Sequence, residues 1–188
     1  MEIVRPIKSL AKIEKIQSIL KKENMRNYIL FNLGIYSGLR ISDVLKFKVK
    51  DLKGEEYFYL TKGNREIKTG KSKKLKIPEE FYNELQEYLK NKEDEEYIFK
   101  SKKGNHPIDR FQAYRILNDV ARKVGIKSEI GTHTLRKTFG YHFYQQTKDI
   151  AMLQLIFNHR SQLDTLRYID IIQEEIDDKM MSFSYAIK

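Results

Sequence analysis

The chain has 188 residues, the size of one ordinary domain, and 40% of them are hydrophobic, which is enough to form a buried core. Because it contains no cysteine, disulfides, thiolate metal sites and cysteine nucleophiles are excluded. The formal net charge is +10, which suggests a polyanionic partner, with nucleic acid as the first candidate, although basic residues also serve solubility. No apolar run is long enough to span a bilayer, and no signal peptide is recognisable, so no membrane partner is expected.

Helical patterns dominate the first part of the chain. Ser9 is expected to cap a helix over about 10–22, whose isoleucines and leucine share one face. A second helix over about 25–36 is apolar almost all round, which predicts a central, buried position, and Gly38 is expected to end it in the left-handed conformation. A short helix is predicted over about 42–47.

The pattern changes between Val49 and Ile77. Residues 57–60 favour a strand, residues 74–77 alternate between polar and apolar, and turn signals lie between them. We therefore expect a small antiparallel sheet of two or three strands. Residues 46–76 carry 11 Lys or Arg residues and only 4 acidic ones, so this basic hairpin either lies against a phosphate backbone or is simply solvated.

Helices resume in the rest of the chain, over about 79–91, 109–124, 133–146, 149–157, 161–168 and 171–181. The predicted fold class is therefore mainly α with a small antiparallel β-sheet (α+β). The last helix is acidic and has apolar residues close to helical spacing, namely Ile171, Ile172, Ile176, Met180 and Phe183. One of its faces must be buried, either on its own domain or on another protein chain.

Two residues at the start of one predicted helix favour an anion site. His133 and Arg136 are three positions apart and so share a face, where free backbone N–H groups add to their charge. The alternative is that Arg136 pairs with a surface carboxylate and that His133 only caps the helix.

Three further residues are candidates for chemistry. His159 and Tyr168 are nine positions apart and would lie on opposite faces of one unbroken helix, but Ser161 is a plausible N-cap that breaks the run and lets them converge. Arg40 follows the tight turn that ends the second helix. It either pairs internally, with Asp43 as the obvious partner, or points at a ligand.

Taken together, these residues resemble the catalytic domain of the tyrosine recombinases, also called the phage integrase family. The resemblance covers the chain from about Ser9 to about Met181. The motifs that carry it are Gly38-Leu39-Arg40-Ile41-Ser42-Asp43, Lys68-Thr69-Gly70-Lys71, His133-x-x-Arg136, His159 and Tyr168. One departure is Asn158 before His159, where the family often has Gly; we expect the turn to survive, because Asn tolerates the left-handed conformation.

The resemblance implies a role for each residue. Arg40 and Arg136 would grip the scissile phosphate, His133 and His159 would be the two active-site histidines, and Tyr168 would be the nucleophile. The lysine that protonates the leaving 5′ oxygen would be Lys68, although Lys71 and Lys73 lie close by on the same hairpin. The residues expected to contact DNA are Lys71, Lys73, Arg110, Arg115 and Lys137.

The implied function is site-specific cutting and rejoining of DNA strands through a covalent 3′-phosphotyrosine, without metal, cofactor or ATP. The expected partners are double-stranded DNA, other copies in a homotetramer on DNA and accessory DNA-bending proteins. Two alternatives remain open: a non-catalytic DNA-binding regulator on the same scaffold, and a topoisomerase of the tyrosine type.

The family also sets expectations for organisation. Residues 1–188 are expected to form one catalytic domain, without the N-terminal DNA-clamping domain of larger members, either as a naturally short member or as an excised domain. The tail helix over about 171–181 would be exchanged between subunits. We expect a bacterial or phage protein of the cytoplasm, associated with the nucleoid.

Overall fold

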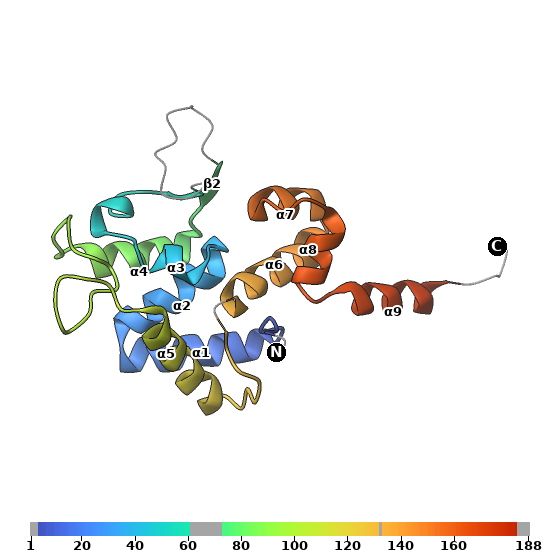
Figure 1. Ribbon diagram of the computed structural model, residues 1–188, viewed down its shortest axis with the longest axis horizontal. Coiled ribbons are helices and arrows are strands. Elements are labelled where there is room, and N and C mark those ends of the chain that lie inside the picture. Colours follow the sequence, from blue (N-terminus) through green and yellow to red (C-terminus); the bar gives the residue numbers. More distant parts are fainter. Residues whose placement is uncertain (1–3, 61–72, 132, 184–188) are drawn as a thin grey trace.

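The computed structural model describes residues 4–60, 73–131 and 133–183, and it is mainly helical, as predicted (Figure 1). The described elements are α1 (Leu10–Glu23), α2 (Met25–Ser37), α3 (Ile41–Val44), a 3-10 turn (Val49–Asp51), β1 (Tyr57–Leu60), β2 (Lys73–Lys76), α4 (Glu79–Leu89), α5 (Arg110–Lys123), α6 (Thr134–Thr147), α7 (Ile150–Phe157), α8 (Gln162–Tyr168) and α9 (Ile172–Ser182). None of the described helices is long and apolar enough to cross a membrane.

The helices begin where the sequence supplies capping side chains. Ser9, Asp109, Asp149 and Ser161 each accept a hydrogen bond from the backbone N–H three residues later, which satisfies a donor that the first turn leaves unpaired. The bounds expected from the sequence are therefore confirmed to within a few residues.

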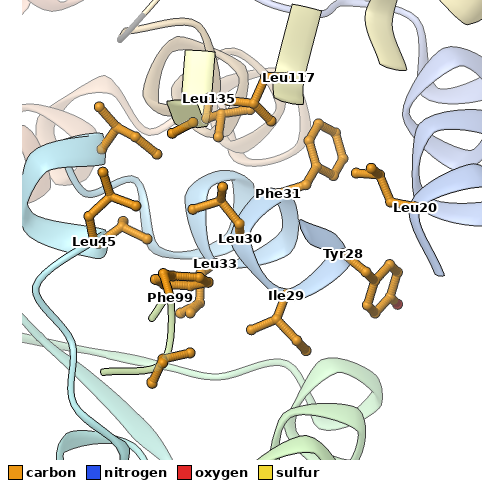
Figure 2. Packing of buried hydrophobic residues seen from close by; sticks show 14 of the residues in the cluster. Leu20, Tyr28, Ile29, Leu30, Phe31, Leu33, Leu45, Phe99, Leu117 and Leu135 are labelled. Atoms are coloured by element: carbon orange, nitrogen blue, oxygen red, sulfur yellow. The ribbon is translucent and has the colours of Figure 1, made fainter. Parts of the chain in front are cut away.

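Helix α2 forms the centre of the main hydrophobic core. Its Ile29, Leu30, Phe31 and Leu33 are almost completely buried, and Figure 2 shows them surrounded by side chains of neighbouring elements, including Leu135 of α6. This confirms the prediction from its nearly continuous apolar sequence. Gly38 ends the helix with φ of +61°, as expected.

Helix α6 joins the main core to a second hydrophobic cluster. Near its start, Leu135 packs against α2 so closely that a Cβ on Gly34 would lie 2.3 Å from Leu135 Cδ1. Near its end, Tyr144 belongs to the second cluster, with Leu153, Phe157, Ile169 and Ile171. Helix α6 thus extends from the main core to the second cluster.

The sheet consists of two antiparallel strands in the described part of the chain. Phe58 is paired with Leu75, and Phe58 is completely buried. The short helix predicted over 42–47 is displaced, because α3 spans only Ile41–Val44. After Val44 the chain continues in turns, and the carbonyl of Phe47 then accepts from the N–H of Ile98, next to an antiparallel bridge between Lys48 and Tyr97.

Helix α9 extends away from the rest of the chain (Figure 1). Ile171, just before it, is completely buried, but the apolar side chains further along are exposed: Ile176 by 49%, Met180 by 64% and Phe183 by 59%. The apolar face of α9 is therefore not docked on its own domain, which was one of its two expected locations.

Candidate active site

Arg136 lies in the first turn of α6 with only 6% of its surface exposed. Its Nη1 donates to the carbonyl of Gly38, its Nη2 donates to the carbonyl of Phe157 at 3.0 Å, and its guanidinium carbon lies 4.1 Å from the centre of the Phe157 ring. The alternative that Arg136 pairs with a surface carboxylate is therefore wrong. Two carbonyls and one aromatic ring hold the guanidinium in place.

Arg40 occupies the N-cap position of α3, directly after the turn at Gly38 and Leu39, and it is exposed. Among the ion pairs of the described residues, none joins Arg40 to Asp43, so the internal pairing considered from the sequence is absent. Burial is the main cause that lowers the pKa of His133 and of His159, and the positive charge of Arg40 adds to the lowering of both.

Tyr168, the last residue of α8, meets His133 across 35 positions of sequence. The Tyr168 hydroxyl lies 3.1 Å from His133 Nδ1, and the two rings are nearly perpendicular. His133 occupies the N-cap position of α6, but its side chain makes no capping hydrogen bond. The reading of His133 as a simple helix cap is therefore wrong.

His159 reaches the same place from the turn between α7 and α8. Asn158 has φ of +54°, as expected for this turn, and Ser161 caps α8, so the interruption between the helices brings the His159 ring within 5.0 Å of the Tyr168 ring. Thr165 donates its hydroxyl proton to the carbonyl of Ser161 at 3.0 Å and therefore accepts from His159 Nδ1 at 3.1 Å. This contact leaves Nε2 of His159 available to a ligand.

Burial controls the protonation of these groups when no DNA is bound. Burial raises the pKa of Tyr168, and the charges of Arg136 and Arg40 oppose that rise without overcoming it. Burial, followed by nearby arginines, lowers the pKa of His133 and of His159. The site therefore holds a neutral tyrosine beside neutral imidazoles at pH 7, whereas the cationic neighbours alone would favour the phenolate.

Sequence reasoning missed two residues that support the site. Phe157 packs its ring under the Arg136 guanidinium and 5.5 Å from the Tyr168 ring, and Thr165 orients His159. The signal for Phe157 was its position two residues before His159, at the end of an apolar helix.

The residues expected to contact DNA fall into three groups. Lys137 lies with its ammonium 5.2 Å from the centre of the Tyr168 ring, and burial lowers its pKa. Arg110 and Arg115 are exposed on α5. Lys73 begins β2, whereas Lys71 falls outside the described residues, as does Lys68, the predicted catalytic lysine.

No group of three or more His, Asp or Glu side chains within residues 4–60, 73–131 and 133–183 could hold a metal ion. The described site instead presents an exposed and a buried guanidinium, two imidazoles and a phenol. This combination can bind a phosphate between its cations and offer it an oxygen nucleophile.

Comparison with known proteins supports this chemistry. A sequence model of the Phage integrase family matches residues 8–175. The probable integrase/recombinase YoeC of Bacillus subtilis (strain 168) is 51% identical over 174 residues, which cover 93% of each chain. Tyrosine recombinase XerA of Pyrococcus furiosus is 27% identical over 169 residues, 88% of this chain, and the match spans only 57% of that relative.

Solved structures share the fold. The crystal structure of XerA recombinase aligns with a TM-score of 0.75 at 21% identity, covering 100% of this chain and 67% of that one. XerH, in a post-cleavage complex with a palindromic difH substrate, aligns with a TM-score of 0.71 at 19% identity, covering 95% of this chain and 53% of that one. The chain belongs to the phage integrase family, the tyrosine recombinases, which are enzymes that cleave and rejoin DNA.

Proposed function

We propose that this protein is a site-specific DNA recombinase that uses Tyr168 as its nucleophile. The observation that carries the proposal is the convergence of Tyr168, His133 and Arg136: the tyrosine hydroxyl lies 3.1 Å from a histidine nitrogen and beside a buried guanidinium. Structural side chains rarely need a buried cation, a neutral base and a phenol at one point, whereas attack of a tyrosine on a phosphodiester uses all three.

The first step is attack of the Tyr168 oxygen on phosphorus. His133 Nδ1 is in position to accept the hydroxyl proton, because its lowered pKa keeps the imidazole neutral. Arg40 and Arg136 neutralise the phosphate and stabilise the charge that grows on its oxygens in the transition state. The negative charge of the bound phosphate partly neutralises the positive charges of Arg40 and Arg136 before the reaction begins.

The bond to the 5′ oxygen breaks as the bond to tyrosine forms, which gives a 3′-phosphotyrosine and a free 5′-hydroxyl. Lys68 is the proposed donor of the proton that the leaving 5′ oxygen requires. Nε2 of His159 becomes a further donor to the phosphate oxygens when the negative charge of the bound phosphate draws a second proton onto this imidazole. The phosphotyrosine conserves the energy of the broken bond. A 5′-hydroxyl of another strand can therefore attack it and release Tyr168, so rejoining needs no ATP or metal.

Covalent capture of DNA tests the proposal and, in the same experiment, identifies the target sequence. Random duplexes are prepared with one 5′-bridging phosphorothiolate at a fixed central position. Cleavage there releases a 5′-thiol that rejoins poorly, so protein–DNA adducts accumulate and their DNA can be sequenced. We expect adducts of related sequence with the wild type and none with Tyr168→Phe, which loses only the attacking oxygen.

The same assay separates the alternatives. A non-catalytic DNA-binding regulator would retain DNA without forming an adduct. A topoisomerase of the tyrosine type would form adducts of unrelated sequence and would relax supercoiled plasmid without a preferred site. Adducts that persist at wild-type levels in Tyr168→Phe would show that another residue is the nucleophile.

We further propose that the enzyme assembles as a tetramer on two DNA duplexes at the nucleoid, with accessory DNA-bending proteins as further partners. Helix α9 supports this arrangement, since its exposed Ile176 and Met180 need an apolar partner surface. Exposed apolar side chains of α7 and α8, Met152 (47%) and Leu163 (48%), provide such a surface on a neighbouring subunit.

A further inference from the structure

The segment before α1 is fixed to α6, the helix that carries Arg136. The N–H of Ile7 donates to the hydroxyl of Thr138 at 2.9 Å, and the carbonyl of Ile7 lies 2.9 Å from Nε2 of His142. Ile7 itself is 95% buried in the main core, since only 5% of its surface is exposed. The backbone at Lys8 is therefore held rigidly beside α6.

Lys8 connects this segment to the chain beyond Tyr168. Its ammonium donates to the backbone carbonyl of Asp170 at 3.0 Å, binds one carboxylate oxygen of Glu174 and lies 5.1 Å from the centre of the Tyr141 ring. The other Glu174 oxygen accepts from the hydroxyl of Tyr141 at 3.1 Å and from the amide of Gln145 at 3.5 Å. Three separate parts of the chain thus meet in one network: the segment before α1, helix α6 and the start of α9.

The backbone of Asp170 adopts the left-handed conformation. It lies two residues after Tyr168 and has φ of +61°, a conformation that costs free energy for a residue with a side chain. Its neighbours Ile169 and Ile171 are completely buried in the second cluster. Any displacement of the Asp170 carbonyl therefore moves the end of α8, where Tyr168 lies.

We infer that Lys8 is a positioning residue that fixes Tyr168 relative to His133 and Arg136, an assignment that rests on the proposed function of Tyr168. Lys8 binds the carbonyl of Asp170, and the backbone of Ile7 binds α6. The same short segment therefore contacts both the chain next to Tyr168 and the helix that carries His133 and Arg136. A phosphoryl acceptor and donor must be aligned closely, and an error of about 1 Å in such an alignment costs up to about 100-fold in rate.

A variant that removes the ammonium tests this inference. Lys8→Met keeps the aliphatic stem against Tyr141 but loses both polar contacts, whereas Lys8→Arg can keep them. Lys12→Met is the matched control, because the ammonium of Lys12 donates to the carbonyl of Gly125, away from the site. The ion pair of Lys8 and Glu174 is about one-third exposed, so its loss has little effect on overall stability and the variant is expected to fold.

The first readout is adduct formation at saturating DNA in a single turnover, with DNA affinity and melting temperature measured in parallel. We expect Lys8→Met to slow adduct formation by about tenfold or more with little change in affinity, while Lys8→Arg and Lys12→Met stay close to wild type. A Lys8→Met rate within about twofold of wild type would overturn the inference.

The second readout needs no DNA and therefore does not depend on the proposed function. In the free protein, the centres of the Tyr168 and His133 rings lie 6.1 Å apart, so ring protons of the two are close enough for NMR cross-relaxation. We expect this signal to weaken in Lys8→Met and to persist in Lys12→Met. An unchanged signal together with an unchanged His133 titration would overturn the positioning role, even if the wild type formed no adduct.

Discussion

Arg136 of α6 donates a hydrogen bond to the carbonyl of Gly38, although 98 positions separate the two residues in the sequence. Gly38 forms the left-handed turn at the end of α2, and Arg40 follows it at the N-cap of α3. One arginine of the site thus fixes the turn that presents the other. The two arginines nevertheless differ in environment, because Arg136 is buried and Arg40 is exposed.

This difference predicts different consequences for the two alanine variants. Arg40→Ala should slow adduct formation by about 10²–10³-fold and leave the stability of the fold nearly unchanged, since it removes a charge whose effect is greatest in the transition state. Kinetics of adduct formation and thermal melting check this expectation. A rate reduction of less than about tenfold would place Arg40 outside the site.

Arg136→Ala should reduce both activity and stability. It removes the second phosphate-binding charge and also leaves the carbonyls of Gly38 and Phe157 without their donor, which costs about 1–3 kcal/mol per group left buried. Denaturant unfolding measures the loss, and Arg40→Ala is the matched control. Equal stability of the two variants would contradict the supporting role of the two carbonyl contacts.

Most of the fold could be predicted from the sequence because its helices are locally determined. Ser9, Asp109 and Ser161 cap helices, and Gly38 and Asn158 end them. The start or end of each of these helices is therefore determined by a few adjacent residues. The same local information gave the turn that separates His159 from Tyr168. The match of residue order to a known family then indicated which dispersed residues belong together.

The supports of the site were not predictable from the sequence, because they depend on contacts between distant segments. The hydrogen bonds of Arg136 go to backbone carbonyls, which every residue type offers equally. The partner of Glu174 is Lys8, 166 positions away, among many other lysines. The net effect on the pKa of Tyr168 depends on how deeply the ring is buried, and the number of nearby cations does not reveal this depth.

The titration of His133 should respond to Arg40. Burial and the charge of Arg40 both lower the pKa of His133, so the free protein should show a titration midpoint below the usual value of about 6.5. Removing the charge in Arg40→Ala should raise the midpoint towards that value. NMR of labelled imidazoles without DNA measures both. A midpoint that does not move would show that the Arg40 charge is screened from His133.

Gly140 should be intolerant of a side chain. A Cβ at this position of α6 would lie 2.7 Å from a methyl carbon of Ile169, which follows Tyr168 in the sequence, and 2.8 Å from the ring of Phe157, whose centre lies 5.5 Å from that of the Tyr168 ring. We expect Gly140→Ala to destabilise the fold by about 1–3 kcal/mol, as overpacking does, and to slow adduct formation as well. Gly54→Ala is the control for replacing a glycine without crowding, because a Cβ there meets nothing within 4 Å, although its φ of +79° adds backbone strain.

The catalytic lysine can be identified by changing the leaving group. Lys68→Ala should impair cleavage of an ordinary phosphodiester in a nicked duplex that traps the cleaved product. The 5′-bridging phosphorothiolate should restore it, because a thiolate leaves without needing a proton. Adduct yield on the two matched duplexes measures the rescue. If Lys71→Ala shows the rescue and Lys68→Ala does not, the assignment shifts by three residues along the hairpin.

Helix α9 provides the last prediction, because its two halves have different environments. Its first turn is bound to its own subunit: Glu174 pairs with Lys8, and Glu175 lies 3.1 Å from the ammonium of Lys148. Beyond it, the apolar side chains of Ile176, Met180 and Met181 are exposed. A truncation after Glu175 therefore removes the surface proposed to bind a neighbouring subunit and keeps the contacts that hold the Tyr168 turn.

The truncated protein should bind a single DNA site almost as well as the intact chain and should form few complexes that join two duplexes, because burial of apolar side chains such as Met180 drives their assembly. Met152→Lys on α7 should cause the same defect, because it changes the surface that is proposed to bind α9 of the neighbouring subunit. Leu10→Lys on α1 is the matched control, since Leu10 is 58% exposed and lies outside the proposed surface. Native gels with one and two duplexes, together with a recombination assay, measure the outcome. If the truncated protein joins and recombines two duplexes as well as the intact one, α9 is not an element that subunits exchange, and its apolar residues serve another purpose.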